Sequence, residues 1–354
     1  MQLNTRTIVG LIALLFCLSP WASGAQNYRT PDFDYFVTGD PSLPHAAHTT
    51  YGLALMGGGG SVEAAFRFIA AHGGHGHMVI LRAVHDDSFD PKDGDYGDSF
   101  ATQWGPVTSA ETIVFHDRKA AFDPRVIKAL HEADGIFLAG GDQANYVKYW
   151  KGTPVQRELN AHVRANRPIG GSSAGLAVLG HFSYTALDGG SLESKVALRQ
   201  PGDASVTLED DFLHFRGMDH VITDTHFSRR CRLGRLIVFV SRINAEHPNA
   251  HAFGVGVDEK TALLVEGDGI ARLAEGSTGS AWVVQAPGVL DYKVPLSLEV
   301  RVERLAAGSA LHVDSGDVDG VAAESTEAIE NGQPTGHSPA TSIMLRSSVR
   351  DNEG

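Results

Sequence analysis

Apolar and polar positions follow two alternating patterns along the first half of the chain. Short apolar runs, several of which end in a glycine-rich turn, have the composition of buried strands, and the segments between them place apolar residues at helical spacing. The strand-like runs are 51–60, 77–84, 112–117, 135–143 and 168–173, and the helical segments are 61–73, 123–133 and 155–166. This order predicts an α/β fold with a doubly wound, mainly parallel sheet and helices on both faces.

The pattern changes elsewhere in the chain. Residues 85–100 are polar and acidic, which predicts a long surface loop, whereas residues 281–305 alternate as strands do. From about Ala306 the chain is rich in Ser, Glu and Gly and has no aromatic residue, so we expect a disordered tail over 306–354. One folded domain is therefore expected over 26–305.

Residues 1–25 have the pattern of a secretory signal peptide. Arg6 supplies a positive charge, residues 8–18 form an apolar core too short to span a membrane, and small residues follow up to a cleavage site after Gly24 or Ala25. We therefore expect an exported protein, periplasmic or extracellular, with no membrane contact after cleavage.

Composition narrows the classes of function. The 354 residues carry a net charge of −13, with 29 Lys and Arg against 42 Asp and Glu, so nucleic-acid binding is not expected. A hydrophobic content of 42% with 40 glycines is typical of a globular, loop-rich enzyme. Signal cleavage would remove Cys17 and leave Cys231 alone, which excludes an internal disulfide in the mature protein.

A serine among small residues is the first candidate for chemistry. Residues 171–175 read Gly-Ser-Ser-Ala-Gly, with a glycine two positions on either side of Ser173. This pattern lets a strand turn sharply into a helix, exposes the serine hydroxyl and lets the N–H of Ala174 face an oxyanion. A tight glycine-rich turn without chemistry is the alternative. The strand before Ser173 and the apolar helix expected after it favour a nucleophile.

A nucleophilic serine needs a base, and His226 is the candidate. It follows a short predicted strand and is expected to open a helix. On that helix Arg229 and Arg230 lie on the histidine's side, near the buried stripe. Arg232 and Arg235 project to the far side, where a solvated face and a functional role are equally compatible.

A third group should orient the imidazole. Asp258 and Glu259 end an apolar strand after the histidine, and a surface ion is the alternative interpretation of either carboxylate. A different order, with the acid before the histidine, is typical of α/β-hydrolases. The carboxylates that could serve in that order are Asp210, Asp211, Asp219 and Asp224.

Glycine-rich and histidine-rich turns offer other sites. The glycines at 57–60 are compatible with a tight βα turn or a phosphate loop, and the N–H groups of Gly58 and Gly59 could also bind an oxyanion. The segment "HGGHGH" at 72–77 favours solvated histidines, and the acidic residues 86–98 lack the spacing of a calcium loop. No metal site and no cofactor are expected.

Four stretches in series, "LAGGDQ", "GGSSAG", "TDTHFSRRCRLGRL" and "GVGVDEKTAL", resemble the cyanophycinase and aspartyl dipeptidase (dipeptidase E-like) family of serine peptidases. The resemblance, within residues 51–265, implies a fold like that of class I glutamine amidotransferases. It implies Ser173 as nucleophile, His226 as base and Glu259, with Asp258 as the alternative, as the orienting acid. The implied substrate-binding residues are Gln143, Asp224, Thr225, Arg230, Arg232 and Arg235. Cyanophycinase proper has glutamine at the position of Thr225.

The resulting hypothesis is a secreted serine peptidase that hydrolyses cyanophycin, a polyaspartate carrying arginines, or related aspartyl or isoaspartyl peptide bonds. Ala174, Gly58 and Gly59 would hold the oxyanion. The expected partner is a peptide substrate, and a homodimer is the one further assembly considered. The alternatives are an α/β-hydrolase-type esterase that uses the same serine and a non-catalytic secreted binding protein.

Overall fold

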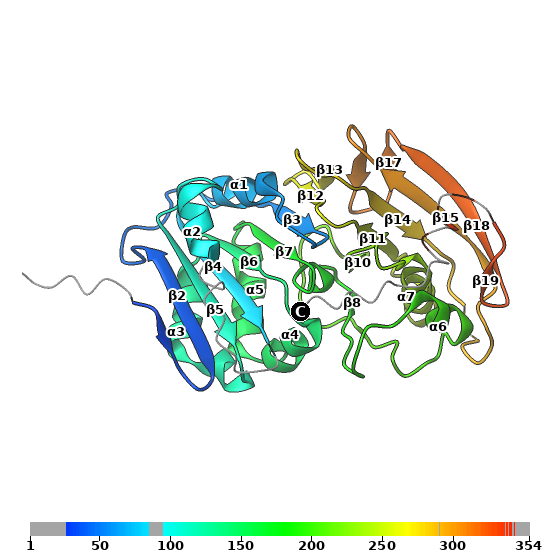
Figure 1. Cartoon of the computed structure of the whole chain (residues 1–354), viewed down its shortest axis with the longest axis horizontal. Helices are drawn as coiled ribbons and strands as arrows, with labels where there is room; N and C mark the ends of the chain where they lie inside the picture. The colour runs from blue at the N-terminus through cyan, green and yellow to red at the C-terminus, as the bar shows by residue number, and fades with distance from the viewer. Residues whose placement is uncertain are drawn as a thin grey trace, which may run out of the picture.

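An 11-stranded mixed sheet with a parallel centre organises most of the chain (Figure 1). The computed structural model describes residues 26–84, 95–289, 291–336, 338, 340, 341 and 343. In spatial order the strands are β1 (Tyr28–Arg29), β2 (Phe33–Gly39), β5 (Ser109–Phe115), β4 (His77–Ala83), β6 (Gly135–Leu138), β7 (Ile169–Ser172), β3 (Leu53–Met56), β12 (Ala262–Val265), β13 (Ile270–Leu273), β16 (Ala310–His312) and β17 (Val318–Asp319). Strands β5, β4, β6, β7 and β3 run parallel, and antiparallel strands flank them on both sides.

Helices cover both faces of the parallel centre, which confirms the predicted α/β architecture. One face packs against α1 (Glu63–His72) and α2 (Asp95–Thr102). The other packs against α3 (Pro124–Glu132), α4 (Gln143–Trp150), α5 (Pro154–Arg164) and the 3₁₀-helix η2 (Arg118–Phe122). Strand β3 is buried throughout because Leu53 and Leu55 face one helical layer and Ala54 and Met56 face the other.

A second sheet of six strands completes the molecule. Its spatial order is β10 (Val221–Asp224), β11 (Phe253–Val257), β14 (Ala281–Gln285), β15 (Leu298–Leu305), β18 (Ala323–Glu330) and β19 (Gln333–Pro334). Helices α6 (Ser194–Arg199) and α7 (Leu233–Glu246) lie beside it, at the end of the molecule opposite β2 (Figure 1). The remaining elements are the pair β8 (Ser183–Tyr184) and β9 (Leu208–Glu209) and the 3₁₀-helix η3 (Leu176–Val178).

The expected disordered tail is wrong over residues 310–334, which contain β16 to β19. These strands are rich in small and polar residues, but pairing with β13 and β15 buries residues such as Leu311 and Ile329. The predicted surface loop is also wrong at its end, because residues 95–102 form α2 with Phe100 buried. Residues 85–94 lie outside the described residues.

The predicted signal peptide, residues 1–25, lies outside the described residues as well. Within the described part of the chain, no helix has the length and apolar character needed to cross a membrane.

Candidate active site

The serine turn is built at the carboxyl end of β7. Ser173 has a φ of +54°, an uncommon backbone conformation that directs the chain sharply away from the strand. A Cβ on Gly171 would lie 2.6 Å from the backbone of Gly175, and one on Gly175 would lie 2.0 Å from the oxygen of Leu138. Both glycines are therefore required by close backbone approach. The chain continues into the 3₁₀-helix η3, so the apolar helix expected after the serine is only a short 3₁₀ turn.

His226 approaches this serine from the second sheet. It lies two residues beyond the end of β10, has a φ of +45°, and its N–H donates to the oxygen of Gly57 at 2.8 Å. The imidazole Nε2 lies 2.8 Å from the hydroxyl oxygen of Ser173, and Nδ1 lies 2.7 Å from a carboxylate oxygen of Glu259. These distances form a continuous hydrogen-bonded chain from hydroxyl to carboxylate.

The two candidate acids have different surroundings. Asp258 accepts from the backbone N–H groups of Ser228 at 2.9 Å and Ser280 at 3.0 Å, so it holds the loop after His226 in place. Glu259 contacts the imidazole, and its second carboxylate oxygen lies 3.6 Å from Nε of Arg229. Among the described residues, Glu259 is the carboxylate that contacts His226.

The glycine turn after β3 forms another wall of the site. Gly58 has a φ of +91°, and a Cβ there would lie 2.6 Å from Nε2 of His226 and 3.1 Å from Cβ of Ser173. Gly59 has a φ of +70°, and its Cβ would meet the side chain of Glu259. The backbone N–H groups of Gly58, Gly59 and Ala174 donate to no acceptor among the described residues. Because buried N–H groups are nearly always paired, those of Gly58 and Ala174 suit a ligand oxygen.

Burial sets the protonation state of the imidazole. It lowers the pKa of His226 to about 4, with the positive charges of Arg230 and Arg232 acting in the same direction and Glu259 opposing them. The ring is therefore neutral near pH 7, as a general base requires.

The arginines after the histidine are arranged differently from the prediction. Helix α7 begins at Leu233 rather than at His226, and residues 227–231 form turns. As a result Arg229 and Arg230 are exposed, whereas Arg232 and Arg235 are 7% and 1% exposed. The outcome is therefore the reverse of the prediction: the two arginines expected near the buried stripe are exposed, and the two expected on the far side are buried.

The buried arginines pair with Asp224 behind the histidine. Arg235 donates from Nε to Asp224 at 2.7 Å and from Nη2 at 2.5 Å, and its Nη1 donates to Ser191 at 2.9 Å. Arg232 donates to the carbonyl oxygen of Thr225 at 3.0 Å and to its hydroxyl at 2.8 Å. Burial alone would raise the pKa of Asp224, but Arg235 and Arg232 hold it below its ordinary value. This network fixes the strand end that carries His226.

The loop between β6 and α4 lies beside Ser173 and leads to the predicted site residue Gln143. It contains a glycine pair, Gly140–Gly141, that the sequence analysis did not single out. Gln143 is the first residue of α4 and is half-buried. Three residues earlier, a Cβ on Gly140 would lie 3.6 Å from Cβ of Ser173, so the loop between β6 and α4 borders the nucleophile. The Gly140–Gly141 pair after an apolar run is the sequence signal for this close approach.

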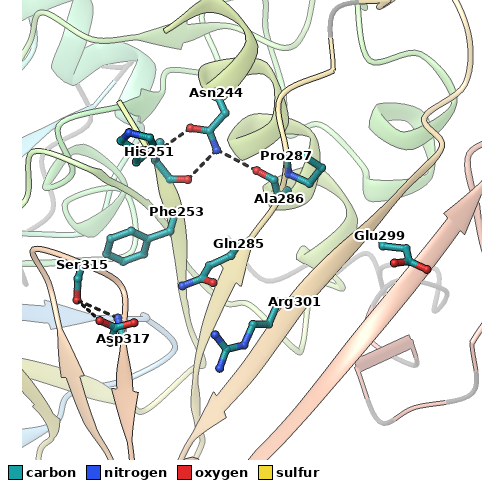
Figure 2. A pocket seen from close by; sticks show the side chains of 11 residues that line it. Asn244, His251, Phe253, Gln285, Ala286, Pro287, Glu299, Arg301, Ser315 and Asp317 are labelled. Atoms are coloured by element: carbon teal, nitrogen blue, oxygen red, sulfur yellow. Dashed lines mark hydrogen bonds between the residues drawn. The ribbon is translucent and has the colours of Figure 1, made fainter. Parts of the chain in front are cut away.

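The other candidate sites do not converge on the triad. A pocket of about 590 Å³ lies at the amino end of β11, whereas Glu259 follows its carboxyl end. Figure 2 shows Asn244 within it, bonded to the backbone of Ala252 and Ala286. None of the predicted site residues line this pocket.

The histidines of the 72–77 segment contact separate partners. His72 pairs with Thr50, His75 with the oxygen of Pro106, and His77 with Ser109. His77 also lies within a possible ligand group with His45 and Asp134, but its second ring nitrogen is 2.9 Å from the oxygen of Leu43. Both of its nitrogens are thus engaged within the protein.

The fold and the site define a class: an α/β protein in which a hydrogen-bonded Ser–His–Glu set lies at the carboxyl ends of β7, β10 and β11. Residues 114–273, which contain all three triad positions, match Peptidase family S51. The chain is 31% identical over 216 residues to a cyanophycinase of Synechococcus elongatus, covering 58% of this chain and 61% of the relative. It is 33% identical over 169 residues to a cyanophycinase of Trichormus variabilis, covering 47% and 51%.

Over part of its length the chain is therefore similar to Peptidase family S51 and to the cyanophycinases. It spans about three fifths and one half of the lengths of these two relatives. Among solved structures, a peptidase from an acI-B1 Actinobacterium is similar with a TM-score of 0.48 and 16% identity, covering 75% of this chain and 98% of that one.

Proposed function

We propose that this protein is a serine peptidase that hydrolyses aspartyl or isoaspartyl peptide bonds, with cyanophycin as the favoured substrate. The observation that carries the proposal is the hydrogen-bonded chain Ser173–His226–Glu259, with its distances of 2.8 and 2.7 Å. The neutral imidazole, the half-buried Ser173 and the N–H groups of Gly58 and Ala174 beside it complete the requirements for acyl transfer.

The proposed reaction has two stages. His226 Nε2 accepts the hydroxyl proton of Ser173 as the oxygen attacks the carbonyl carbon of the substrate, and the oxyanion forms hydrogen bonds with the N–H groups of Ala174 and Gly58. The imidazolium then protonates the leaving amine, the C–N bond breaks, and an acyl-enzyme remains. Water, deprotonated by His226, releases the acid and returns the serine.

Two observations support an aspartyl substrate. The curated relatives are named cyanophycinases. In addition, the guanidinium of Arg230 is exposed beside His226 and pairs with no described residue, so it is available for a substrate carboxylate. Thr225 stands where cyanophycinase proper has glutamine. Its side chain is 3% exposed and accepts a hydrogen bond from Arg232, so it would affect the substrate only by fixing the backbone next to His226.

The proposal is tested by incubating purified protein with cyanophycin, a β-aspartyl-arginine dipeptide, an α-aspartyl dipeptide and a simple ester. Hydrolysis of an aspartyl substrate in preference to the ester is expected. Preference for the ester would favour the esterase alternative, although Glu259 follows His226 in the chain, unlike the order typical of α/β-hydrolases. Failure of a serine-reactive probe to label Ser173 would favour the binding protein.

Export remains part of the proposal, on the pattern of residues 1–25. N-terminal sequencing of protein expressed from the full chain should find a mature terminus after Gly24 or Ala25 and place the protein outside the cytoplasm. An intact N-terminus would contradict export by this route.

A further inference from the structure

Two histidines outside the triad face one another at the spacing of metal ligands. The Nδ1 atoms of His181 and His214 lie 3.4 Å apart. Hydrogen bonds from N–H donors are shorter, about 2.7–3.2 Å. In a tetrahedral zinc site, bonds of about 2.0–2.1 Å put two imidazole nitrogens roughly 3.3–3.4 Å from each other. We propose that His181 and His214 bind one divalent transition-metal ion such as Zn²⁺ through their Nδ1 atoms, with water completing the coordination.

The backbone that carries His214 is held firmly. Asn160 of α5 accepts from the N–H of His214 at 2.8 Å, and Gln156, one turn earlier, donates to the oxygen of Phe212 at 2.6 Å. Phe212 and Leu213 are fully buried. The imidazole of His214 therefore projects from a fixed turn, which lowers the entropy cost of binding a metal.

The backbone of His181 is held by β10. The N–H of Phe182 donates to the oxygen of Val221 at 3.2 Å, and Phe182 is 4% exposed. The ring of His181 packs edge-on against that of Phe182, with 4.7 Å between ring centroids. Both ligands therefore come from ordered segments, and the side chain of His214 is 44% exposed, so an ion can reach the pair from solvent.

The surrounding charges suit a cation. Asp211 lies 3.5 Å from Nε2 of His214, which favours a proton on Nε2 and leaves the Nδ1 lone pair for a metal. The carboxylates of Asp210, Asp211 and Asp219 lie near the two histidines and provide a negative potential.

The location argues for a role outside catalysis. Phe182 pairs with Ile222 near the amino end of β10, whereas His226 follows its carboxyl end. An ion between His181 and His214 would tie the segment after the serine turn to the loop that covers α5. Its expected effect is on stability, not on the chemical step.

The test is a calorimetric titration of Zn²⁺ alone into the full-length protein after treatment with a chelator. Wild type should bind Zn²⁺ with a dissociation constant on the order of micromolar, and His181→Ala and His214→Ala should each remove that binding event. Asp211→Asn should weaken it by about 10-fold, because the carboxylate acts only through His214. Zn²⁺ should raise the melting temperature of the wild type and of neither histidine variant.

His312→Ala is the matched control. His312 is also a partly exposed histidine with a carboxylate nearby, Asp319 at 3.0 Å, but it lies on β16. This variant should bind Zn²⁺ as the wild type does, and circular dichroism should show all variants folded. Absence of binding in the wild type, or equal binding in His181→Ala and His214→Ala, would overturn the proposal.

Discussion

The hydroxyl of Ser173 lies 2.8 Å from Nε2 of His226, at a turn that needs only a small side chain. Ser173→Ala removes one oxygen and keeps the Cβ, so the fold and melting temperature should be nearly unchanged. Hydrolysis of aspartyl substrates should fall at least about 1,000-fold, because the attacking atom is lost. Residual activity above about 1% would point to another nucleophile. Ser172→Ala is the control at the adjacent serine and should remain active.

The pKa of His226 predicts a pH profile. Because burial lowers that pKa to about 4, the base stays neutral well below the ordinary histidine value of about 6.5. Measured as kcat/KM on an uncharged dipeptide ester, activity should hold as pH falls through 6 and decline only on approach to the lowered pKa. Arg230→Gln removes a positive charge that lowers this pKa, so its acid limb should move to higher pH. If Arg230→Gln leaves the acid limb of the pH profile unshifted, or if the wild-type limb has its midpoint near pH 6.5, burial and Arg230 do not lower the pKa of His226 as described.

Arg230 also predicts substrate preference. A guanidinium can form two parallel hydrogen bonds with a carboxylate, which lysine cannot reproduce. Arg230→Lys should therefore lower kcat/KM on aspartyl substrates by a factor equivalent to about 1–3 kcal/mol of transition-state binding. The fold should be unchanged. The simple ester, which has no carboxylate, should lose much less. Equal losses on both substrates would leave Arg230 without a role in carboxylate recognition.

At the scale of elements, strand ends were predictable and the turn after β10 was not. An apolar run followed by glycines locates the ends of β3 and β7, because packing on both faces and a tight turn are local requirements. The residues after His226 continue a helical pattern, but Phe227 is buried against Gly256 and Ser228 is held by Asp258. These tertiary contacts delay the helix to Leu233 and reverse the sides of the arginines.

The buried pair Asp224–Arg235 predicts a stability effect at this junction. Arg235→Leu leaves the buried carboxylate of Asp224 with the N–H of Thr225 at 2.8 Å and a longer contact, 3.4 Å, to Arg232. Because its closest charged partner is lost, the free energy of unfolding should fall by about 3–5 kcal/mol in urea denaturation. The double variant Asp224→Leu/Arg235→Leu should recover part of this loss. If Arg235 instead contacted the substrate directly, Arg235→Leu would leave the free energy of unfolding unchanged and would raise KM.

At the scale of the whole molecule, the expectation from local composition that the folded domain ends at residue 305 was wrong. Ser173 and His226 could be predicted from their local sequence patterns, whereas Glu259 was preferred over Asp258 only through the family resemblance. Strands β16 to β19 could not be predicted, because Ala and Glu are the commonest residues in β16 and β18, and because the stability of these strands comes from partners distant in sequence. Strand β18 pairs along its length with β15, from Leu298 opposite Ile329 to Arg304 opposite Ala323. The expectation of disorder stays a prediction for residues 337, 339, 342 and 344–354, which lie outside the described residues.

Truncation after Leu305 therefore tests the extent of the domain. It removes β16 to β19, exposes the edge of β15 and deletes Leu311, Val313 and Ile329, each 1% exposed. Their burial is worth on the order of 5 kcal/mol, close to the whole stability of an ordinary domain. The truncated chain should be insoluble or lack a cooperative unfolding transition. Truncation after Ile343, which keeps every described residue, is the control and should unfold like the full chain. A soluble, cooperatively folded and active fragment ending at 305 would show that these outer strands of the two sheets are not needed to hold His226 and Glu259 in place.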